Sequence, residues 1–487
     1  MSKKTQSYTN RKHRKYIPER MPGNVAVKNK GGWLPGANGR AAKVEALLRG
    51  RKEETKEIAG NMAGYKDSGV EEVNFIPKDW NTLRMKDAFN ISKEIIGDKW
   101  TEAALLSLTT NGVKSITADE QVGKRPKTFA TYQRVTKNDI VMCLFDLDAS
   151  AVFSGLSGYD GMISPAYKIL KTKEQVLPEF ANYYFQYIFE GRKYKKYAKS
   201  IRYTLSGEEF LRLLIVLPPL HEQQRIADFL DTKCSILDRT IDAVSRQIED
   251  LEKYKKALIT KTVTKGICKK GEPERAMKDS GVEWIGEVPE EWSVSKVKYN
   301  FSTFKKIPGK ESEKYERLSL TMNGVKHREK WTAEGLQPKD FMSYQLLRKG
   351  DLVFRLIDLQ NPSKSRRVAL SHDTGLISPA YTILHADNNK MLPEYAEMFF
   401  LMMSYLDVFN ALGSCGVRSS INNAELMKIS VLVPPLAEQQ QIADYLDEKC
   451  KNIDNRVQKR RQQLEWLKEY KKSLIFDYVT EKKRVEK

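Results

Sequence analysis

The sequence lacks both a cysteine framework and a long apolar run. Its five cysteines are scattered and none forms a CxxC pair, which argues against a disulfide scaffold and against a zinc cluster. The longest apolar stretch, around Leu213 to Leu220, is short and is interrupted by Pro218 and Pro219. A membrane-spanning helix needs about 20 apolar residues, so none is expected. The N-terminus is polar and does not look like a signal peptide, so we expect a cytoplasmic protein.

The sequence also lacks the loops with which common catalytic domains bind cofactors. It has no GxxxxGK phosphate loop followed by Ser or Thr, no NPPY- or NPPF-type methyltransferase loop and no compact cluster of nuclease carboxylates. The segments LPPL and VPPL contain a proline pair without the polar residue that a base-flipping methyltransferase uses. Asp146 and Asp148 in LFDLDAS suggest a metal site, but a second copy of this segment, LIDLQNP, retains only Asp358. We therefore favour a loop or strand-end role for these aspartates.

What the chain does contain is an internal repeat. LPPLHEQQRIADFLDTKC (Leu217 to Cys234) returns as VPPLAEQQQIADYLDEKC (Val433 to Cys450), 216 positions later. The phrases LSLTTNGVK and LSLTMNGVK match at a shift of 212, and ISPAYKIL and ISPAYTIL match at a shift of 214. Matched segments in matched order imply one fold used twice, with different sequences between the shared segments.

The net charge of +20 indicates a polyanionic partner, but much of it lies in an N-terminal extension. Residues 1–60 hold 15 Lys and Arg against 5 Asp and Glu, which is half of the excess. We expect residues 1–64 to form a basic and largely disordered extension, because aliphatic residues are few there. It is either an arm that follows phosphates or a solvated, dispensable segment.

Two long amphipathic helices are expected directly after the proline pairs. Pro219 suits the first helical position, and EQQRIADFLD continues with helix formers. Farther along, apolar residues recur at steps of four and three, the spacing of a seam that packs against another helix. They are Leu237, Ile241, Val244, Ile248, Leu251 and Leu258 in the first copy and Ile453, Val457, Leu464, Leu467 and Leu474 in the second. Arg460 takes the place of Val244 and weakens the second seam locally.

We favour pairing of these two helices with each other over packing of each on its own domain, because both seams are narrow and flanked by charge. If a twofold axis relates the repeats, the helices cross antiparallel with one globular domain at each end. A helix over residues 235–261 would be roughly 40 Å long. Reading heads on one face of B-DNA are about 34–36 Å apart. The helix pair would therefore have a suitable length to set the distance between two DNA-reading domains.

The order of these motifs resembles that of the specificity subunit of type I restriction–modification systems. Two globular regions each lead into a PPLxEQQxIAxxLDxKC helix, and the opening phrase KDSGVEW (Lys278 to Trp284) and the SPAY segments are similar to that family's. The resemblance spans about residues 65–483 and depends on several motifs that occur twice in the same order. The N-terminal extension departs from the family's usual pattern.

The resemblance implies a DNA-recognition subunit that is not itself catalytic. Each globular region would be a target recognition domain for one half of a bipartite, asymmetric site in double-stranded DNA. The helices would set the spacer and dock two modification (methyltransferase) subunits, which bring S-adenosylmethionine. Restriction subunits would add translocation and cleavage with ATP and Mg. This chain itself would bind no cofactor and no metal.

Contacts that read sequence should lie where the two repeats diverge. Arginine suits this task because its planar fork binds guanine O6 and N7 together, although most basic residues at such interfaces touch phosphate. The first domain offers Lys124, Arg125, Lys127, Arg134, Arg202 and Tyr203, and the second offers Lys326, Arg328, Lys330, Arg355, Arg366, Arg367 and Arg418. Arg202 and Arg418 occupy equivalent positions, which favours a shared phosphate contact or an ion pair. The aromatic groups in ANYYFQYIF and AEMFFLMMSYL have helical spacing, so we expect buried helix faces rather than base-stacking platforms.

The expected fold class is mixed α/β: two tandem α/β target recognition domains separated by two long antiparallel coiled-coil helices in a pseudo-twofold arrangement. The first domain should cover residues 65–217, the first helical region 218–265, a linker 266–277, the second domain 278–433 and the second helical region 434–487. KNDIVMCLF and KGDLVFRLI predict strands, and the segments after LPE predict helices. Two alternative functions stay open: a coiled-coil adaptor for proteins, and a fused methyltransferase or nuclease, against which the missing loops argue.

Overall fold

The computed structural model describes residues 64–70, 73–110, 112–117, 119–120, 126–147, 152–190, 197–198, 203–267, 271, 275–329, 340–359, 366–413, 419–480 and 482–485. The expected N-terminal extension lies almost entirely outside the described residues. The same holds for five candidate DNA-binding residues, which are Lys124, Arg125, Arg202, Lys330 and Arg418.

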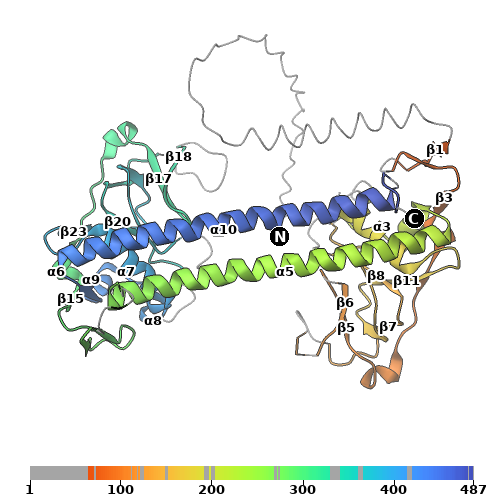
Figure 1. Cartoon of the computed structure of the whole chain (residues 1–487), viewed down its shortest axis with the longest axis horizontal. Coiled ribbons are helices and arrows are strands. Elements are labelled where there is room, and N and C mark those ends of the chain that lie inside the picture. The colour runs from red at the N-terminus through yellow and green to blue at the C-terminus, as the bar shows by residue number, and fades with distance from the viewer. Residues whose placement is uncertain are drawn as a thin grey trace, which may run out of the picture.

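Two mixed α/β domains lie at opposite ends of a pair of long helices (Figure 1). Helix α5 (Leu220–Lys265) follows the first domain and helix α10 (Leu436–Val479) follows the second. The two helices lie side by side and run in opposite directions, so each domain sits beside the start of its own helix and the end of the other. Within the described residues, no helix combines the length and the apolar character needed to cross a membrane.

The first domain consists of short strands and a few helices. Its strands are β1 (Tyr65–Asp67), β2 (Phe75–Pro77), β3 (Asn81–Arg84), β4 (Phe89–Ser92), β5 (Leu106–Thr109), β6 (Gly112–Ser115), β7 (Gln133–Val135), β8 (Ile140–Met142), β9 (Ser154–Leu156), β10 (Gly161–Ile163), β11 (Lys168–Thr172) and β12 (Leu214–Leu217). Its helices are α2 (Met85–Ala88), the 3-10 helix η2 (Gly97–Thr101), α3 (Pro178–Glu190) and α4 (Gly207–Arg212).

The second domain repeats this order of elements, with α8 (Val408–Leu412) as one further described helix. Its strands are β13 (Met277–Asp279), β14 (Glu287–Pro289), β15 (Ser293–Lys296), β16 (Phe301–Ser302), β17 (Arg317–Thr321), β18 (Gly324–Arg328), β19 (Gln345–Leu347), β20 (Leu352–Phe354), β21 (Val368–Leu370), β22 (Gly375–Ile377), β23 (Thr382–Ala386) and β24 (Ser430–Val433). Its helices are α6 (Val297–Asn300), the 3-10 helix η4 (Gly309–Lys314), α7 (Pro393–Tyr405), α8 (Val408–Leu412) and α9 (Asn423–Lys428).

The sheets confirm that one fold is used twice. The antiparallel sheet β4-β11-β8-β9 of the first domain has its counterpart in β16-β23-β20-β21. Their registers agree, since Val141 lies opposite Ile169 in one sheet and Val353 lies opposite Ile383 in the other. The domains differ in the remaining strands: β18-β17-β22-β19 form one sheet in the second domain, whereas β5-β6 and β10-β7 are separate ladders in the first.

Each domain core includes the far end of the opposite helix. The core of the first domain contains Leu474, Ile475 and Val479 from the end of α10. The core of the second contains Ile259 and Val263 from the end of α5. The aromatic residues of α3 and α7 are buried in these cores, as their spacing predicted. Each domain is therefore completed by a segment that belongs to the other repeat.

The long helices begin as the sequence predicted, with a shift of one residue. Pro219 and Pro435 are the N-cap residues of α5 and α10 and have extended backbone, so each helix starts at the leucine that follows. The Pro219 carbonyl accepts from the backbone N–H of Glu222 and of Gln223. A proline costs nothing at this position, because the N–H groups at a helix start have no partner within the helix.

Candidate functional site

A buried tryptophan ties each domain to the start of its helix. The Trp80 ring nitrogen donates to the Glu222 carboxylate at 3.0 Å, and Trp292 donates to Glu438 at 2.8 Å. Both indole rings are fully buried. In the second copy Arg275 also forms a bidentate pair with Glu438. Burial alone would raise the pKa of Glu438, but the hydrogen bonds from Arg275 and Trp292 lower it below its usual value.

The EQQ part of the repeated motif fixes the angle between domain and helix. The buried Gln223 accepts from the Leu177 N–H at 2.8 Å and donates to the carbonyls of Gln175 and Pro218. Its counterpart Gln439 makes the same three bonds, with the Leu392 N–H and the carbonyls of Lys390 and Pro434. A side chain whose three bonds reach two segments holds them in one relative orientation. Both domains are therefore mounted on their helices in the same way.

The predicted seam residues lie between the two long helices, with one exception. Val244, Ile248, Ile453, Val457 and Leu467 form a buried cluster, and Leu237, Ile241, Leu251, Leu258 and Leu464 pack against it. Leu474 belongs to the core of the first domain instead. Arg460, which interrupts the second seam, lines a groove of about 360 Å³ between the helices together with Gln247, Asp250, Leu251 and Arg456.

Two of the ion pairs between the helices repeat the symmetry of the helix pair, whereas a third, Arg461–Glu252, has Ser245 and Lys468 at its counterpart positions and is not repeated. Lys255 pairs with Asp454, and Lys471 pairs with Asp238, each with 2.7 Å between nitrogen and oxygen. Both members of the second pair are the 216-residue counterparts of the first, with the helices exchanged. An interface in which residue i contacts j and the counterpart of j contacts the counterpart of i is isologous, as at a twofold axis. The axis of this pseudo-symmetry crosses the pair near Gln247.

Helix α5 fills almost all of the expected helical region 218–265, yet only part of it lies between the two domains. At about 1.5 Å per residue, α5 with its 46 residues is roughly 69 Å long. Its first and last turns are buried in the two domains. The stretch between them, from Leu237 to Leu258, spans roughly 32 Å. That length is close to the roughly 34–36 Å that separates reading heads on one face of B-DNA.

The described candidate residues of the first domain differ in solvent exposure and in their contacts. Lys127 is exposed. Arg134, on β7, is exposed and pairs with Glu94 at 3.0 Å. Tyr203 is partly buried, its ring packs against the domain core, and its carbonyl accepts from the Leu147 N–H. Lys127 and Arg134 are therefore placed for contact with another molecule, whereas Tyr203 supports the loop that contains Leu147.

In the second domain three candidates lie at or near the surface. Lys326 is exposed on β18, and Arg328 is partly exposed at the end of that strand. Arg366 precedes β21, and its guanidinium lies 3.4 Å from the carboxylate of Glu397 on α7. Burial raises the pKa of Glu397, and the charge of Arg366 opposes part of that rise. Glu397 therefore holds the Arg366 side chain between the β17–β18 turn and α7.

Two other candidates of the second domain are buried, which corrects the prediction. Arg355 and Arg367 are each 6% exposed. Arg367 donates to the carbonyls of Ile357, Asp358 and Leu359, and Arg355 lies 3.6 Å from the Asp358 carboxylate. Asp358 has a φ of 56°, so its carbonyl turns toward these guanidinium groups. The two arginines hold an irregular turn, and we remove them from the set of residues proposed to contact DNA.

A second pair of buried glutamines was missed in the reading of the sequence. Gln133 donates to the carbonyls of Ser164 and Tyr167, and Gln345 donates to those of Ser378 and Tyr381. These bonds hold the SPAY turns, in which burial raises the pKa of both Tyr167 and Tyr381. The signal was available, because Gln133 and Gln345 are related by the same 212-residue shift as neighbouring motifs.

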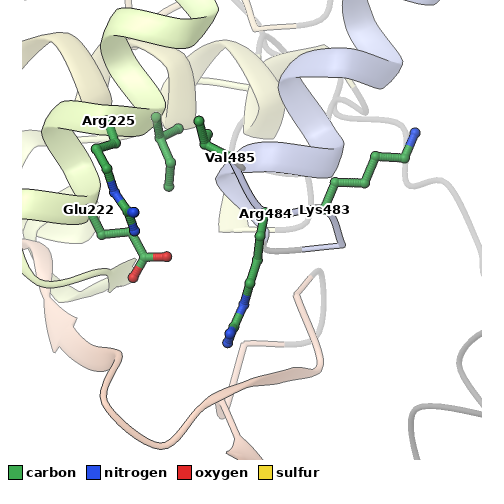
Figure 2. Close-up of a pocket in the computed structure, with 6 residues that line it drawn as sticks. Glu222, Arg225, Lys483, Arg484 and Val485 are labelled. Atoms are coloured by element: carbon green, nitrogen blue, oxygen red, sulfur yellow. The ribbon is translucent and has the colours of Figure 1, made fainter. Parts of the chain in front are cut away.

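A crevice marks the place where the chain end meets the start of α5. Figure 2 shows Glu222 and Arg225 of α5 on one side and Arg484 and Val485, which follow α10, on the other. Lys483 points away and pairs with Asp477. The crevice has no room for a ligand, so it is a junction rather than a binding pocket. Among the residues that the structure describes, no group of three or more His, Cys, Asp or Glu is placed to hold a metal ion.

Comparisons with known proteins identify a family, relatives and a shared fold. The family model for the type I restriction modification DNA specificity domain matches residues 77–253 and 380–465, more than half of the chain. The specificity subunit of the type I restriction enzyme MjaVIII from Methanocaldococcus jannaschii is 25% identical over 454 residues, covering 87% of this chain and 98% of the relative. A chain from a solved structure of a type I R-M system has a TM-score of 0.57 at 13% identity, covering 83% of this chain and 98% of its own length. That last likeness shows a shared fold.

Proposed function

The chain belongs to the family of type I restriction modification DNA specificity domains and recognises DNA sequence in such a system. We propose that it does so with two recognition domains held at a fixed distance by the helix pair. In this proposal each α/β domain reads one half of a bipartite, asymmetric site in double-stranded DNA. The antiparallel helices fix the gap between the halves. The observation that carries the proposal is the isologous helix pair, with Lys255–Asp454 and Lys471–Asp238 exchanged by the pseudo-twofold axis.

The proposal assigns sequence reading to the surface where the domains differ. Lys127 and Arg134 in the first domain and Lys326, Arg328 and Arg366 in the second are the described residues that we propose for contact with bases or phosphates. Lys124, Arg125, Arg202, Lys330 and Arg418 stay predictions outside the described residues. Tyr203 stays in the set only as a support of the surrounding loop.

We assign no catalysis and no cofactor to this chain. In the proposal two modification subunits dock on the helices and bring S-adenosylmethionine, and restriction subunits bring ATP and Mg for translocation and cleavage. A cytoplasmic location is part of the same proposal. Failure of the purified chain to bind S-adenosylmethionine on its own, with binding by its complex with modification subunits, is the expected result in calorimetry.

The central experiment compares the bases read with the gap between them. The chain is expressed with its modification subunits, and methylated adenines are mapped across the genome of a host with and without it. We expect a bipartite site with one fixed gap. Inserting seven residues after Gln247 and seven after Gln463 keeps the seam and lengthens the free stretch by about 10 Å, or about three base pairs.

The insertion should change only the gap, while replacement of residues 65–217 by another subunit's domain should change one half-site only. An insertion that alters the half-site bases and keeps the gap would contradict a gap that is set by the helices. A protein adaptor predicts no sequence-selective binding of duplex DNA at any salt concentration, which distinguishes that alternative.

A further inference from the structure

Each long helix carries a second stripe of residues at steps of four and three, beside the seam that joins the pair. Such a stripe occupies one side of a helix and has the spacing at which another helix packs. The stripe comprises Ile236, Thr240, Ala243, Gln247, Asp250 and Tyr254 on α5, and Asn452, Arg456, Lys459, Gln463, Trp466 and Tyr470 on α10. The two sets are counterparts at the 216-residue shift.

The stripe is exposed and contains the large apolar residues that the helix pair leaves in solvent. Ile236 is 49% exposed, Tyr254 58%, Trp466 62% and Tyr470 45%. Apart from the first residue of each helix, these are the exposed large hydrophobic side chains within α5 and α10. Aromatic residues exposed to this extent on a regular stripe are typical of an interface with another protein.

The stripe faces away from the recognition domains. On the opposite side of α10, Lys472 pairs with Glu190 of α3 at 3.0 Å. Its counterpart on α5, Lys256, lies over the ring of Tyr405 of α7. Lys472 and Tyr470 are two residues apart, which places them about 160° to 200° apart around the helix axis. The stripe is therefore open to a partner that binds without displacing either domain.

The two halves of this face have different chemistry. Toward the first domain, Trp466 and Tyr470 are stacked with 5.4 Å between ring centroids. Ile236 belongs to the same half, because its neighbour Asp238 pairs with Lys471. Toward the second domain the counterparts of Trp466 and Tyr470 are Asp250 and Tyr254.

A groove of about 360 Å³ opens in the half near the second domain. Arg456 and Arg460 line it opposite Asp250, Gln247 and Leu251. The two halves thus differ where Trp466 has Asp250 as its counterpart and Ile236 has Asn452: the half near the first domain is mainly apolar and aromatic, and the other keeps Tyr254 but is otherwise polar and charged. The two sites related by the pseudo-twofold axis are therefore formed by different residues.

The charge of the two helices differs in the same segment. Residues 456–472 of α10 hold seven Lys and Arg and two Glu, whereas residues 240–256 of α5 hold four basic and four acidic residues. A partner helix on this face is favoured if it is itself acidic at its flanks, because opposite charges across an interface attract and like charges repel.

We propose that this face binds two amphipathic helices with acidic flanks, one from each of two modification subunits, and that the two sites differ in strength. The site formed by Ile236, Trp466 and Tyr470 is the stronger, since Trp and Tyr dominate the energy of protein interfaces. The site around Asp250 and Arg456 is weaker and sensitive to salt, because exposed charges are screened. This inference rests on the proposed function, which supplies the partner.

The test titrates the full chain with purified modification subunit, using native mass spectrometry and calorimetry at low and high salt. Expected is a one-to-one complex at low subunit concentration and a second binding step that is weaker by roughly tenfold or more beyond the statistical difference for identical sites. High salt should weaken the second step more than the first.

Two exchanges between counterparts sharpen the test. Trp466→Asp, which copies Asp250, should weaken the first step by roughly tenfold or more, and Asp250→Trp should strengthen the second. Tyr299→Asp, at a side chain of similar exposure on α6, is the matched control and should change neither step. All three residues are exposed, and circular dichroism verifies that the variants fold.

Two binding steps of equal affinity that Trp466→Asp leaves unchanged would overturn the inference. Because two modification subunits would still bind, that result would leave the proposed function intact. Lower affinity for duplex DNA with unchanged subunit binding in Trp466→Asp would also overturn it and would assign the face to DNA. No association of the wild-type chain with the modification subunit at either salt concentration would contradict the proposed function itself.

Discussion

The two recognition domains agree at their attachment to the helices and differ in the interior next to strands β8 and β20. Trp80 and Trp292, and likewise Gln223 and Gln439, make the same bonds to the same parts of the motif. In the loop that follows β8 and β20, by contrast, Cys143 stands where the second domain has Arg355. Two further counterparts differ in the same way, with Phe153 for Arg367 and Asn182 for Glu397. The difference teaches that the attachment to the helices is shared, whereas the interior next to the outer loops is packed differently in each domain.

The largest expected effect comes from removing the end of α10. A chain that stops after Ser473 loses Leu474, Ile475 and Val479 from the first domain core, and buried aliphatic residues contribute about 2–5 kcal/mol each. We expect the first domain to lose cooperative unfolding while the second keeps it, measured by limited proteolysis with mass spectrometry. Deletion of residues 486–487 alone is the control. Equal damage to both domains would show that the two cores are not separate.

A smaller effect is expected from the attachment itself. Gln223→Leu leaves the Leu177 N–H and the carbonyls of Gln175 and Pro218 without their partner, which should lower the free energy of unfolding by about 3 kcal/mol. Gln439→Leu should cost the same, and denaturant titration measures both. Gln224→Leu, at an exposed neighbour, should have little effect. A large difference between the two variants in the free energy of unfolding would show that the two domains are not attached to their helices in the same way.

The ion pairs across the helices offer a more delicate test of symmetry. In a double-mutant cycle on Lys471 and Asp238, we expect a coupling energy of about 0.5–1 kcal/mol, because one partner is largely exposed. The cycle on Lys255 and Asp454 should give the same value. Thermal unfolding in low salt measures both cycles. Coupling in one pair and none in the other would argue against a true pseudo-twofold interface.

The smallest expected effect is a pH dependence confined to the second domain. Burial raises the pKa of Glu397, so the folded protein binds more protons than the unfolded chain between the ordinary and the raised pKa. Stability should therefore fall as pH rises through that window. Glu397→Gln should remove this part of the slope, and the first domain, with Asn182 in that place, should lack it. Denaturant titration at several pH values checks this, and an unchanged slope in Glu397→Gln would refute it.

The repeat and the seam were predictable because both are patterns along the chain. Residues from Leu237 to Leu258 at steps of four and three indicate a helix partner, and duplicated motifs indicate a duplicated fold. The pattern does not show where a seam ends. Leu474 continues the spacing but packs into the first domain, because the helix runs past its partner into that core.

The candidate arginines were the least predictable part. Arg355 and Arg367 lie in a basic segment where the repeats diverge, which suggested contact with DNA. Inside the domain, however, carbonyl groups of an irregular turn accept hydrogen bonds from Arg367, and Arg355 lies beside the same turn. Sequence gives the charge of such a side chain but not the direction of backbone carbonyls near it. Arg134 and Arg366, by comparison, are accessible to another molecule, as a DNA contact requires. Their contact with DNA stays a prediction.

The shared cores also determine the order in which the molecule can be completed during synthesis. Ile226, at the start of α5, packs in one cluster with Ile475, so the first domain core stays incomplete until the end of α10 has left the ribosome. The second domain, whose borrowed residues Ile259 and Val263 precede it, has every part of its core at hand as soon as its own helix begins to emerge. The domain that is synthesised first is thus completed last, and a polypeptide that ends before Leu474 would contain one complete domain at most.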